Sequence, residues 1–356
     1  MAEGKKVEVL ARKIFPEGIL IDHDNGFDET VAQSQEAIKR ATSNTPIFNA
    51  LLTAGTLVAE TDILLPIDDE FEIYEVKSST EEKEDFIPDI AYQKYVAEQA
   101  GLKIKATKLV TINSKFINNG NLYNDPPDLP DNPEQLNALF SINDISDAVD
   151  AHFPLIEKNI SIAEQVIGLK EPPSEKIGDK CKDCPVKPDC WKDILAEKNN
   201  IFTLHRLGKK AYGWHEQGII KNTEIPSDYS LNDKQKIQIE AEKTGEVYID
   251  KVEVGQFLEQ LKYPLYALDF ESINPVLPIN NSHPYEQIPF QFSLHIVDAL
   301  DADPTHHSWI WDNREDDDDD EDNDDPRREM LIQLQPLLKD TGSIIAYHAS
   351  FEKGIL

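Results

Sequence analysis

Apolar and polar positions alternate along two neighbouring stretches of the first eighty residues. The stretch 71–79, FEIYEVKSS, has a period of two and predicts a strand with Glu75 and Lys77 on one face. The stretch 56–65 predicts a second strand, which carries Asp62, and the intervening PIDDE supplies Pro and Asp for a turn. A hairpin of these strands brings Asp62 close to Glu75 and Lys77. Two converging carboxylates repel each other unless a hard divalent cation such as Mg²⁺ lies between them.

Helical spacing and further alternation extend this hairpin into an α/β pattern, in the order helix, three strands, helix, strand. We expect Val9, Leu10 and Ile14 of the first helix to pack inward, and Asp28 to be the N-cap of the second. Gly101 is a typical C-terminal stop for the helix before it. The remaining predicted helices and strands span 5–15, 28–41, 46–55, 85–100, 106–116 and 144–167.

The last part of the chain has a second α/β pattern. YPLYALDFES predicts an apolar strand that ends near Asp269 and Glu271, and QIPFQFSLHIVD predicts the next strand. A helix over 327–338, a strand over 343–350 and the start of a helix at Phe351 follow. This is the opening half of an α/β domain. A sheet of this kind has an unpaired edge and an uncovered face.

The three cysteines of the chain lie together in CKDCPVKPDCW, with the spacing C-x₂-C-x₅-C. Three thiolates so close in sequence favour a shared soft metal ion or an iron–sulfur cluster. An odd number of cysteines in a chain that begins without a secretion signal fits a disulfide framework poorly. Zinc stays open as the alternative, and a tetrahedral zinc site also needs a fourth ligand. We therefore predict a metal or cluster site at Cys181, Cys184 and Cys190.

The formal net charge of −32 argues against a protein that coats nucleic acid through a general positive field. Eleven acids and one arginine lie between Asp312 and Asp325, which we interpret as a solvated insertion whose acidic surface offers a site for a protein partner. Lys209 and Lys210 are a local basic pair that suits a phosphate backbone or, equally, a structural helical hairpin. No apolar run approaches the roughly 20 residues of a membrane-spanning helix, so we expect a soluble, cytoplasmic protein.

The order Asp62, Glu75-x-Lys77, and then a helix with Gln93 and Tyr95 resembles the RecB-type branch of the PD-(D/E)XK nucleases. The resemblance implies that Asp62 and Glu75 bind Mg²⁺ or Mn²⁺ and that Lys77 orients the attacking water. It also implies DNA contacts by Gln93 and Tyr95.

The same resemblance implies two further groups of site residues. Glu8 of the first helix lies where related enzymes place another acid or a histidine near the metal. The spacing of the three cysteines is similar to that of the iron–sulfur members of this branch. That likeness implies a 4Fe-4S cluster in preference to Zn²⁺ at these residues.

YPLYALDFESINPVLP and GSIIAYHASFEKGIL closely resemble the bacterial domain-of-unknown-function family 2779. Members of that family commonly join a nuclease-like half to a DnaQ-like half with an RNase H fold. The DnaQ-like pattern implies that Asp269 and Glu271 are catalytic metal ligands, and that Glu352 stands where those exonucleases usually have an aspartate.

The predicted fold class is α/β, with a restriction-endonuclease-like domain and a partial RNase H-like domain, joined by a cysteine cluster and a small helical segment. The predicted parts span 1–170, 171–195, 196–250 and 251–356, the last with the acidic insertion 312–325.

We expect a metal-dependent nuclease that acts on DNA, single-stranded or at ends. We also expect a fragment of a longer protein, because a fourth cysteine and a late-helix acid of the related patterns have no counterpart here. Two alternatives are a catalytically silent nucleic-acid-binding scaffold and a structural module whose acidic surface binds a protein.

Overall fold

The computed structural model describes residues 2–119, 133–226, 228–279, 281–311 and 325–355. Most of the acidic run, 312–324, lies outside the described residues. The chain divides into two compact units, one made of Met1–Glu164 with Lys262–Leu356, the other of Gln165–Leu261. Both sheets of the protein are mixed and belong to the first unit, so the predicted α/β class is confirmed at this coarse level.

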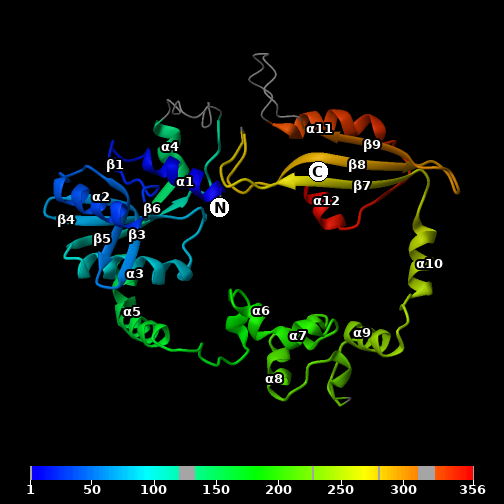
Figure 1. Ribbon diagram of the computed structural model, residues 1–356. Coiled ribbons are helices and arrows are strands. Elements are labelled where there is room, and N and C mark those ends of the chain that lie inside the picture. The colour runs from blue at the N-terminus through cyan, green and yellow to red at the C-terminus, as the bar shows by residue number, and fades with distance from the viewer. Residues whose placement is uncertain (1, 120–132, 227, 280, 312–324, 356) are drawn as a thin grey trace. The chain divides into compact units, whose positions relative to one another are not determined.

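The first sheet has six strands in the order of the sequence, β1-β2-β3-β4-β5-β6 (Figure 1). The β1–β2 and β4–β5 pairs are parallel and the others are antiparallel. Thr56–Leu65 and Phe71–Ser79 were expected to form a hairpin, and β3 and β4 do so. The strands span Ile19–Leu20, Ile47–Ala54, Leu57–Ile67, Glu70–Val76, Ile104–Ile112 and Phe140–Asp144.

Helices cover this sheet because each has an apolar stripe to bury. On α3, the stripe consists of Ile90, Ala91, Val96 and Ala97, all fully buried. The predicted stop is confirmed, since α3 ends just before Gly101, which has a left-handed φ of 91°. The helices of this part are α1 (Ala2–Arg12), α2 (Phe27–Arg40), η1 (Glu84–Phe86), α3 (Ile87–Gln99), α4 (Pro133–Leu139) and α5 (Ser146–Ile167).

Two local predictions for the first helices are wrong. In α1, Leu10 and Ile14 pack against the core as predicted, but Val9 is 41% exposed. Val7 and Ala11 are fully buried instead, because the apolar stripe follows the i, i+4 spacing from Val7. The N-cap of α2 is Gly26, with a φ of 89°, and Asp28 lies in the first turn. There the carboxylate of Asp28 still interacts favourably with the helix dipole.

The second sheet has the order β10-β7-β8-β9, with β10 parallel to β7 and the other pairs antiparallel. β9 was not predicted from the sequence, and β10 is shorter than the predicted strand. In Figure 1, α11 and α12 flank this sheet from opposite sides. The elements are β7 (Leu265–Ile273), β8 (Ile288–Val297), β9 (Thr305–Ile310), α11 (Pro326–Leu334), η5 (Gln335–Leu337), β10 (Ser343–Ile345) and α12 (Ala349–Ile355).

Burial alternates along the strands of the second sheet. On β7, Tyr266, Leu268 and Phe270 are buried against Met330 and Leu334 of α11. Asp269 and Glu271 point to the opposite face and are exposed. α12 flanks this opposite face, so the expected uncovered face is not found among the described residues.

The second unit is a set of short helices around Ile201, Leu204, Ala211 and Trp214. α10 has no buried residue and was not predicted. Its elements are η2 (Asp179–Cys181), α6 (Lys187–Cys190), α7 (Lys192–Ala196), η3 (Ile201–Thr203), α8 (Lys210–Glu216), η4 (Asn222–Glu224), α9 (Asp233–Thr244) and α10 (Lys251–Gln260). Of all the helices in the described ranges, none is long and apolar enough to cross a membrane.

Candidate functional site

The β3–β4 hairpin brings the side chains of Asp62 and Glu75 together. The ladder pairs Ile63 with Tyr74 and Leu64 with Ile73, and the same register continued by one residue sets Asp62 opposite Glu75. Oδ2 of Asp62 accepts a hydrogen bond of 2.7 Å from the Val76 amide, which ties the carboxylate to the end of β4. The expected meeting of these two acids therefore follows from the strand register.

Lys77 comes directly after β4 and joins two acids. Its Nζ donates to Oε1 of Glu75 at 2.6 Å and to Oδ2 of Asp89, on α3, at 2.9 Å. The other oxygen of Glu75 accepts a 2.8 Å hydrogen bond from Nε2 of Gln93. Both oxygens of Glu75 are thus held, and the amide oxygen of buried Gln93 has no partner among the described residues.

Burial and neighbouring charges shift the pKa values of the ionisable groups in this cluster. Burial and the charges of Glu75 and Glu8 hold the pKa of Asp62 well above its usual value, against the opposing effects of the Val76 amide and Lys77. Burial also raises the pKa of Glu75, although Lys77 and Gln93 act in the opposite direction. Burial alone lowers the pKa of Lys77, but Glu75 and Asp89 outweigh it and raise the pKa, so the ammonium stays protonated.

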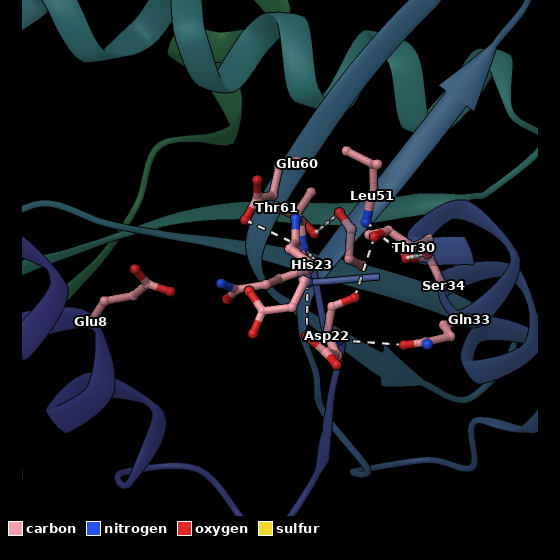
Figure 2. A network of polar contacts seen from close by, with 12 residues as sticks. Glu8, Asp22, His23, Thr30, Gln33, Ser34, Leu51, Glu60 and Thr61 are labelled. Carbon is pink, nitrogen blue, oxygen red and sulfur yellow. Dashed lines mark hydrogen bonds and ion pairs between the residues drawn. The ribbon is translucent and has the colours of Figure 1, made fainter. Parts of the chain in front are cut away.

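A second set of polar contacts lies around Asp22 and His23, between α2 and the strands β2 and β3 (Figure 2). Glu8 pairs with Arg12 of the same helix, and Nη2 of Arg12 also donates to Oδ1 of Asn49 at 2.8 Å. The carbonyl oxygen of Asn49 lies 2.9 Å from Nε2 of His23, which in turn is 3.7 Å from Glu60. Asn49 has a left-handed φ of 57° inside β2, and the β2–β3 register sets it opposite Asp62. Glu8 is therefore engaged by Arg12 while its charge still acts on Asp62.

Sequence reasoning assigned no site role to Arg12, Asn49 or Asp89. For Asp89 a signal existed, because it lies one helical turn before Gln93 on the same face of α3. For Asn49, only the β2–β3 register of the folded protein shows that it lies opposite Asp62. Arg12 lies one turn after Glu8, a spacing that is also common in surface ion pairs.

Tyr95 lies apart from the Glu75–Gln93 contact. Its ring packs edge-on against Phe153 of α5, with ring centroids 6.0 Å apart. This is the expected packing of a half-buried aromatic residue between two helices. The DNA contact expected of Tyr95 remains a prediction.

The opposite face of β4 holds another buried acid, in a different environment. Oε2 of Glu72 accepts from Lys108 Nζ at 2.7 Å and from the Tyr74 hydroxyl at 2.7 Å. These partners, and the charge of Lys108, outweigh burial and lower the pKa of Glu72. In this network Glu72 is paired directly with a cation, Lys108.

The donor set at Asp62 and Glu75 fits one hard cation held mainly by water and substrate oxygens. Among the described residues, no three His, Cys, Asp or Glu side chains form a ready metal site. Mg²⁺ usually keeps several waters and uses only one or two protein carboxylates, with phosphate oxygens completing the shell. Half-buried Asp62 and buried Glu75, both with raised pKa values, supply the negative charge that such an ion neutralises.

The acids of the last part of the chain also lie close together. Burial and the charges of Asp269 and Glu271 raise the pKa of Glu352, although a hydrogen bond from the Phe270 backbone opposes this. Glu352 is buried, and its Oε2 has no partner among the described residues. The side chains of Asp269 and Glu271 are exposed on the face of β7 that α12 flanks, and their charges act on Glu352 of that helix.

The three cysteines are free thiols on consecutive turns of the second unit. The amide of Cys184 bonds to the carbonyl of Cys181, and the amide of Gly178 donates to Sγ of Cys181 at 3.4 Å. Cys181 and Cys184 are half-buried and Cys190 is exposed. A weak amide donor to sulfur is common at thiolate ligands, and the donor type suits a soft metal or cluster.

The architecture is that of a mixed α/β protein with an acidic cluster on one hairpin. Residues 266–356 match the family model described as Domain of unknown function (DUF2779), which supports membership of that family for this part, about a quarter of the chain. No curated protein and no solved structure was found to match.

Proposed function

We propose that this protein is a metal-dependent nuclease that hydrolyses phosphodiester bonds of DNA at the Asp62–Glu75–Lys77 cluster. The observation that carries the proposal is the pair of neighbouring carboxylates, half-buried Asp62 and buried Glu75, both with raised pKa, beside a protonated lysine. The finer fold assignments belong to the same proposal. They are a restriction-endonuclease-like arrangement around β2–β5 and a partial RNase H-like arrangement around β7–β10.

Asp62 and Glu75 would hold Mg²⁺ or Mn²⁺, with Glu8 as a further acid within electrostatic reach of Asp62. The bound ion would stabilise the negative charge that builds up on the phosphate and on the leaving oxygen. Release of Glu8 from Arg12 would be needed before Glu8 joined the site.

Lys77 would act as a hydrogen-bond donor and not as the base, because its neighbours raise its pKa. Its ammonium would orient the attacking water, while Asp89 and Glu75 keep Nζ in place. Gln93 fixes Glu75 through Oε2. In this scheme α3 supplies the support and β4 the reacting groups.

The direct test is cleavage of single-stranded and double-stranded DNA by purified protein with Mn²⁺. We expect Glu75→Ala and Lys77→Ala to remove the activity. Glu72→Gln, on the other face of β4, is the matched control and should retain it. Unchanged cleavage by both Glu75→Ala and Lys77→Ala would refute the proposal.

A binding protein without catalysis is the second candidate. Both oxygens of Glu75 accept hydrogen bonds, from Lys77 and Gln93, so a metal ion would have to compete with these donors. This candidate predicts retention of DNA without divalent-dependent cutting. A third role, docking of a protein on the acidic surface, would be favoured if no nucleic acid bound at low salt.

Two further sites belong to the proposal. Asp269, Glu271 and Glu352 would form a second cation site, since burial and mutual repulsion raise the pKa of Glu352. Cys181, Cys184 and Cys190 would hold a 4Fe-4S cluster or, less favoured, Zn²⁺. Visible absorption and iron analysis after anaerobic purification distinguish these, and a colourless protein with stoichiometric zinc would rule out the cluster.

A further inference from the structure

The connection between β7 and β8 reaches from the family-matched segment into the core beside β4. Val276 is 1% exposed and packs in the same cluster as Val7 and Ala11 of α1, with Leu277 at its edge. Packing of these two aliphatic side chains in the core holds this end of the connection in place. The connection is therefore part of the first unit's core and not a free loop.

Hydrogen bonds hold the rest of the connection on both sides. The Asn281 amide donates to the carbonyl of Asn118 at 2.7 Å, and Nδ1 of His283 lies 2.9 Å from the carbonyl oxygen of Phe116. On the other side Arg327 of α11 pairs with Glu286 at 2.5 Å and donates to the Asn281 carbonyl at 3.1 Å. Residues 281–286 are therefore held at several points.

Tyr285 is the residue of this connection that reaches the candidate site. Its hydroxyl donates to the backbone carbonyl of Ser78, the residue directly after Lys77. Its own backbone has a left-handed φ of 60°, which is costly for a bulky side chain, and its amide is held at 2.8 Å by the Pro275 carbonyl. Even so, the side chain is 42% exposed. The fold thus fixes the ring at one end and leaves much of it in water.

We propose that Tyr285 is a stacking platform for a base of single-stranded DNA that enters the Lys77 site. This rests on the proposed nuclease function and adds a substrate contact to it. Base–aromatic stacking is sequence-tolerant, and a ring fixed in advance loses little entropy when a base binds. A ring anchored one residue from Lys77 places the stacked base next to the phosphodiester that is to be cut.

The net charge of the chain also favours base stacking as a source of affinity for single-stranded DNA. With a formal net charge of −32, the protein has little general attraction for phosphates. Affinity for a single strand must then come from contacts that do not depend on net positive charge. An exposed, fixed aromatic ring is such a contact.

The test is binding of a short fluorescent single-stranded DNA in Ca²⁺, measured by anisotropy on the full chain. Tyr285→Ala should weaken binding by roughly 5- to 150-fold, the range that loss of one stacked base gives. Tyr285→Phe should retain most of the affinity, because the ring remains. The slope of affinity against salt should be the same in all three proteins, since no phosphate contact is removed. Tyr248→Ala, at an exposed tyrosine of the second unit, is the matched control and should bind like wild type.

A photocrosslink gives a readout that a merely structural role would not produce. Single-stranded DNA with 5-iodouracil should crosslink to Tyr285, as mapped by mass spectrometry. Equal affinity of wild type and Tyr285→Ala, or crosslinks that never map to Tyr285, overturns the proposal. If Tyr285→Phe loses as much affinity as Tyr285→Ala, the hydroxyl contact to Ser78 is what matters, and stacking is refuted. Binding is measured without turnover, so failure of the nuclease assignment is seen separately as absence of Mn²⁺-dependent cleavage.

Discussion

Glu72 and Glu75 lie on the same strand, three residues apart, and are 8% and 5% exposed. Their pKa values nevertheless move in opposite directions, down for Glu72 and up for Glu75. Glu72 faces Lys108 and the Tyr74 hydroxyl, so its negative charge is fully compensated. Glu75 faces Lys77 too, but shares its surroundings with Asp62 and Asp89.

Burial alone therefore does not identify a functional acid. A buried carboxylate with a matched cation contributes to stability. Several neighbouring carboxylates around one lysine leave an excess of negative charge, which a divalent cation can neutralise. The two faces of β4 can therefore be tested against each other.

Loss of the Glu75–Lys77 contact should have the largest effect. We expect Glu75→Gln and Lys77→Met each to lower the Mn²⁺-dependent cleavage rate by about 10²- to 10³-fold, because each removes a group aligned with the reacting phosphate. Single-turnover cleavage of single-stranded DNA measures this. Circular dichroism checks that the fold is kept, and a variant that cuts at the wild-type rate removes Glu75 or Lys77 from the mechanism.

Loss of Lys108 should act on stability instead. Lys108→Met leaves Glu72 buried without its cation, and we expect the free energy of unfolding to fall by about 1–3 kcal/mol. Urea denaturation measures this change. Cleavage per folded molecule should stay the same, and a parallel loss of activity would mean that the two faces of β4 are not independent.

Neutralising Asp62 should stabilise the protein. Because the folded pKa of Asp62 is raised, its ionisation makes the folded protein less stable as pH rises from its usual value, 3.8, toward the folded value. Asp62→Asn removes the cost, and we expect a gain of about 1–2 kcal/mol at pH 7 without divalent cations. Thermal unfolding in a chelator measures it. A loss of stability would show that Asp62 is held by favourable contacts.

The pH dependence of the Glu72 contribution should be the smallest effect. Its folded pKa is lowered, so its stabilising contribution is present above its usual value of 4.5 and is lost as pH falls toward the folded value. Wild type should exceed Glu72→Gln in stability by about 1 kcal/mol or less at neutral pH, because Lys108 is partly exposed. The gap should close in acid. A difference in stability that widens in acid would mean that the pKa of Glu72 is raised in the folded state and not lowered.

Part of this site was predictable from the sequence, because period-two alternation fixes which residues share a face. The turn between β3 and β4 then sets the register, and with it the meeting of Asp62 and Glu75. The pairing of β2 with β3 across from Asn49 was not predictable. Its left-handed backbone inside a strand has no sequence signature apart from the general tolerance of Asn for that region.

The contact of Tyr285 with Ser78 could not be predicted from the sequence either. It joins residues about 200 positions apart, and no local pattern carries such a pairing. The position of Val276 was not predictable either. Its sequence neighbourhood predicts an irregular connection, but the side chain is buried beside α1. The missed strand β9 has no buried residue and only His307 and Trp309 are half-buried, so the sequence THHSWI shows little apolar alternation.

Calorimetric titration with Mn²⁺ tests the central claim most directly, with wild type, Glu75→Gln and Glu72→Gln compared at neutral pH. Our account predicts that Glu75→Gln binds one Mn²⁺ fewer than wild type, while Glu72→Gln binds the same number with the same affinity. Equal binding by wild type and Glu75→Gln, or a loss confined to Glu72→Gln, would contradict it.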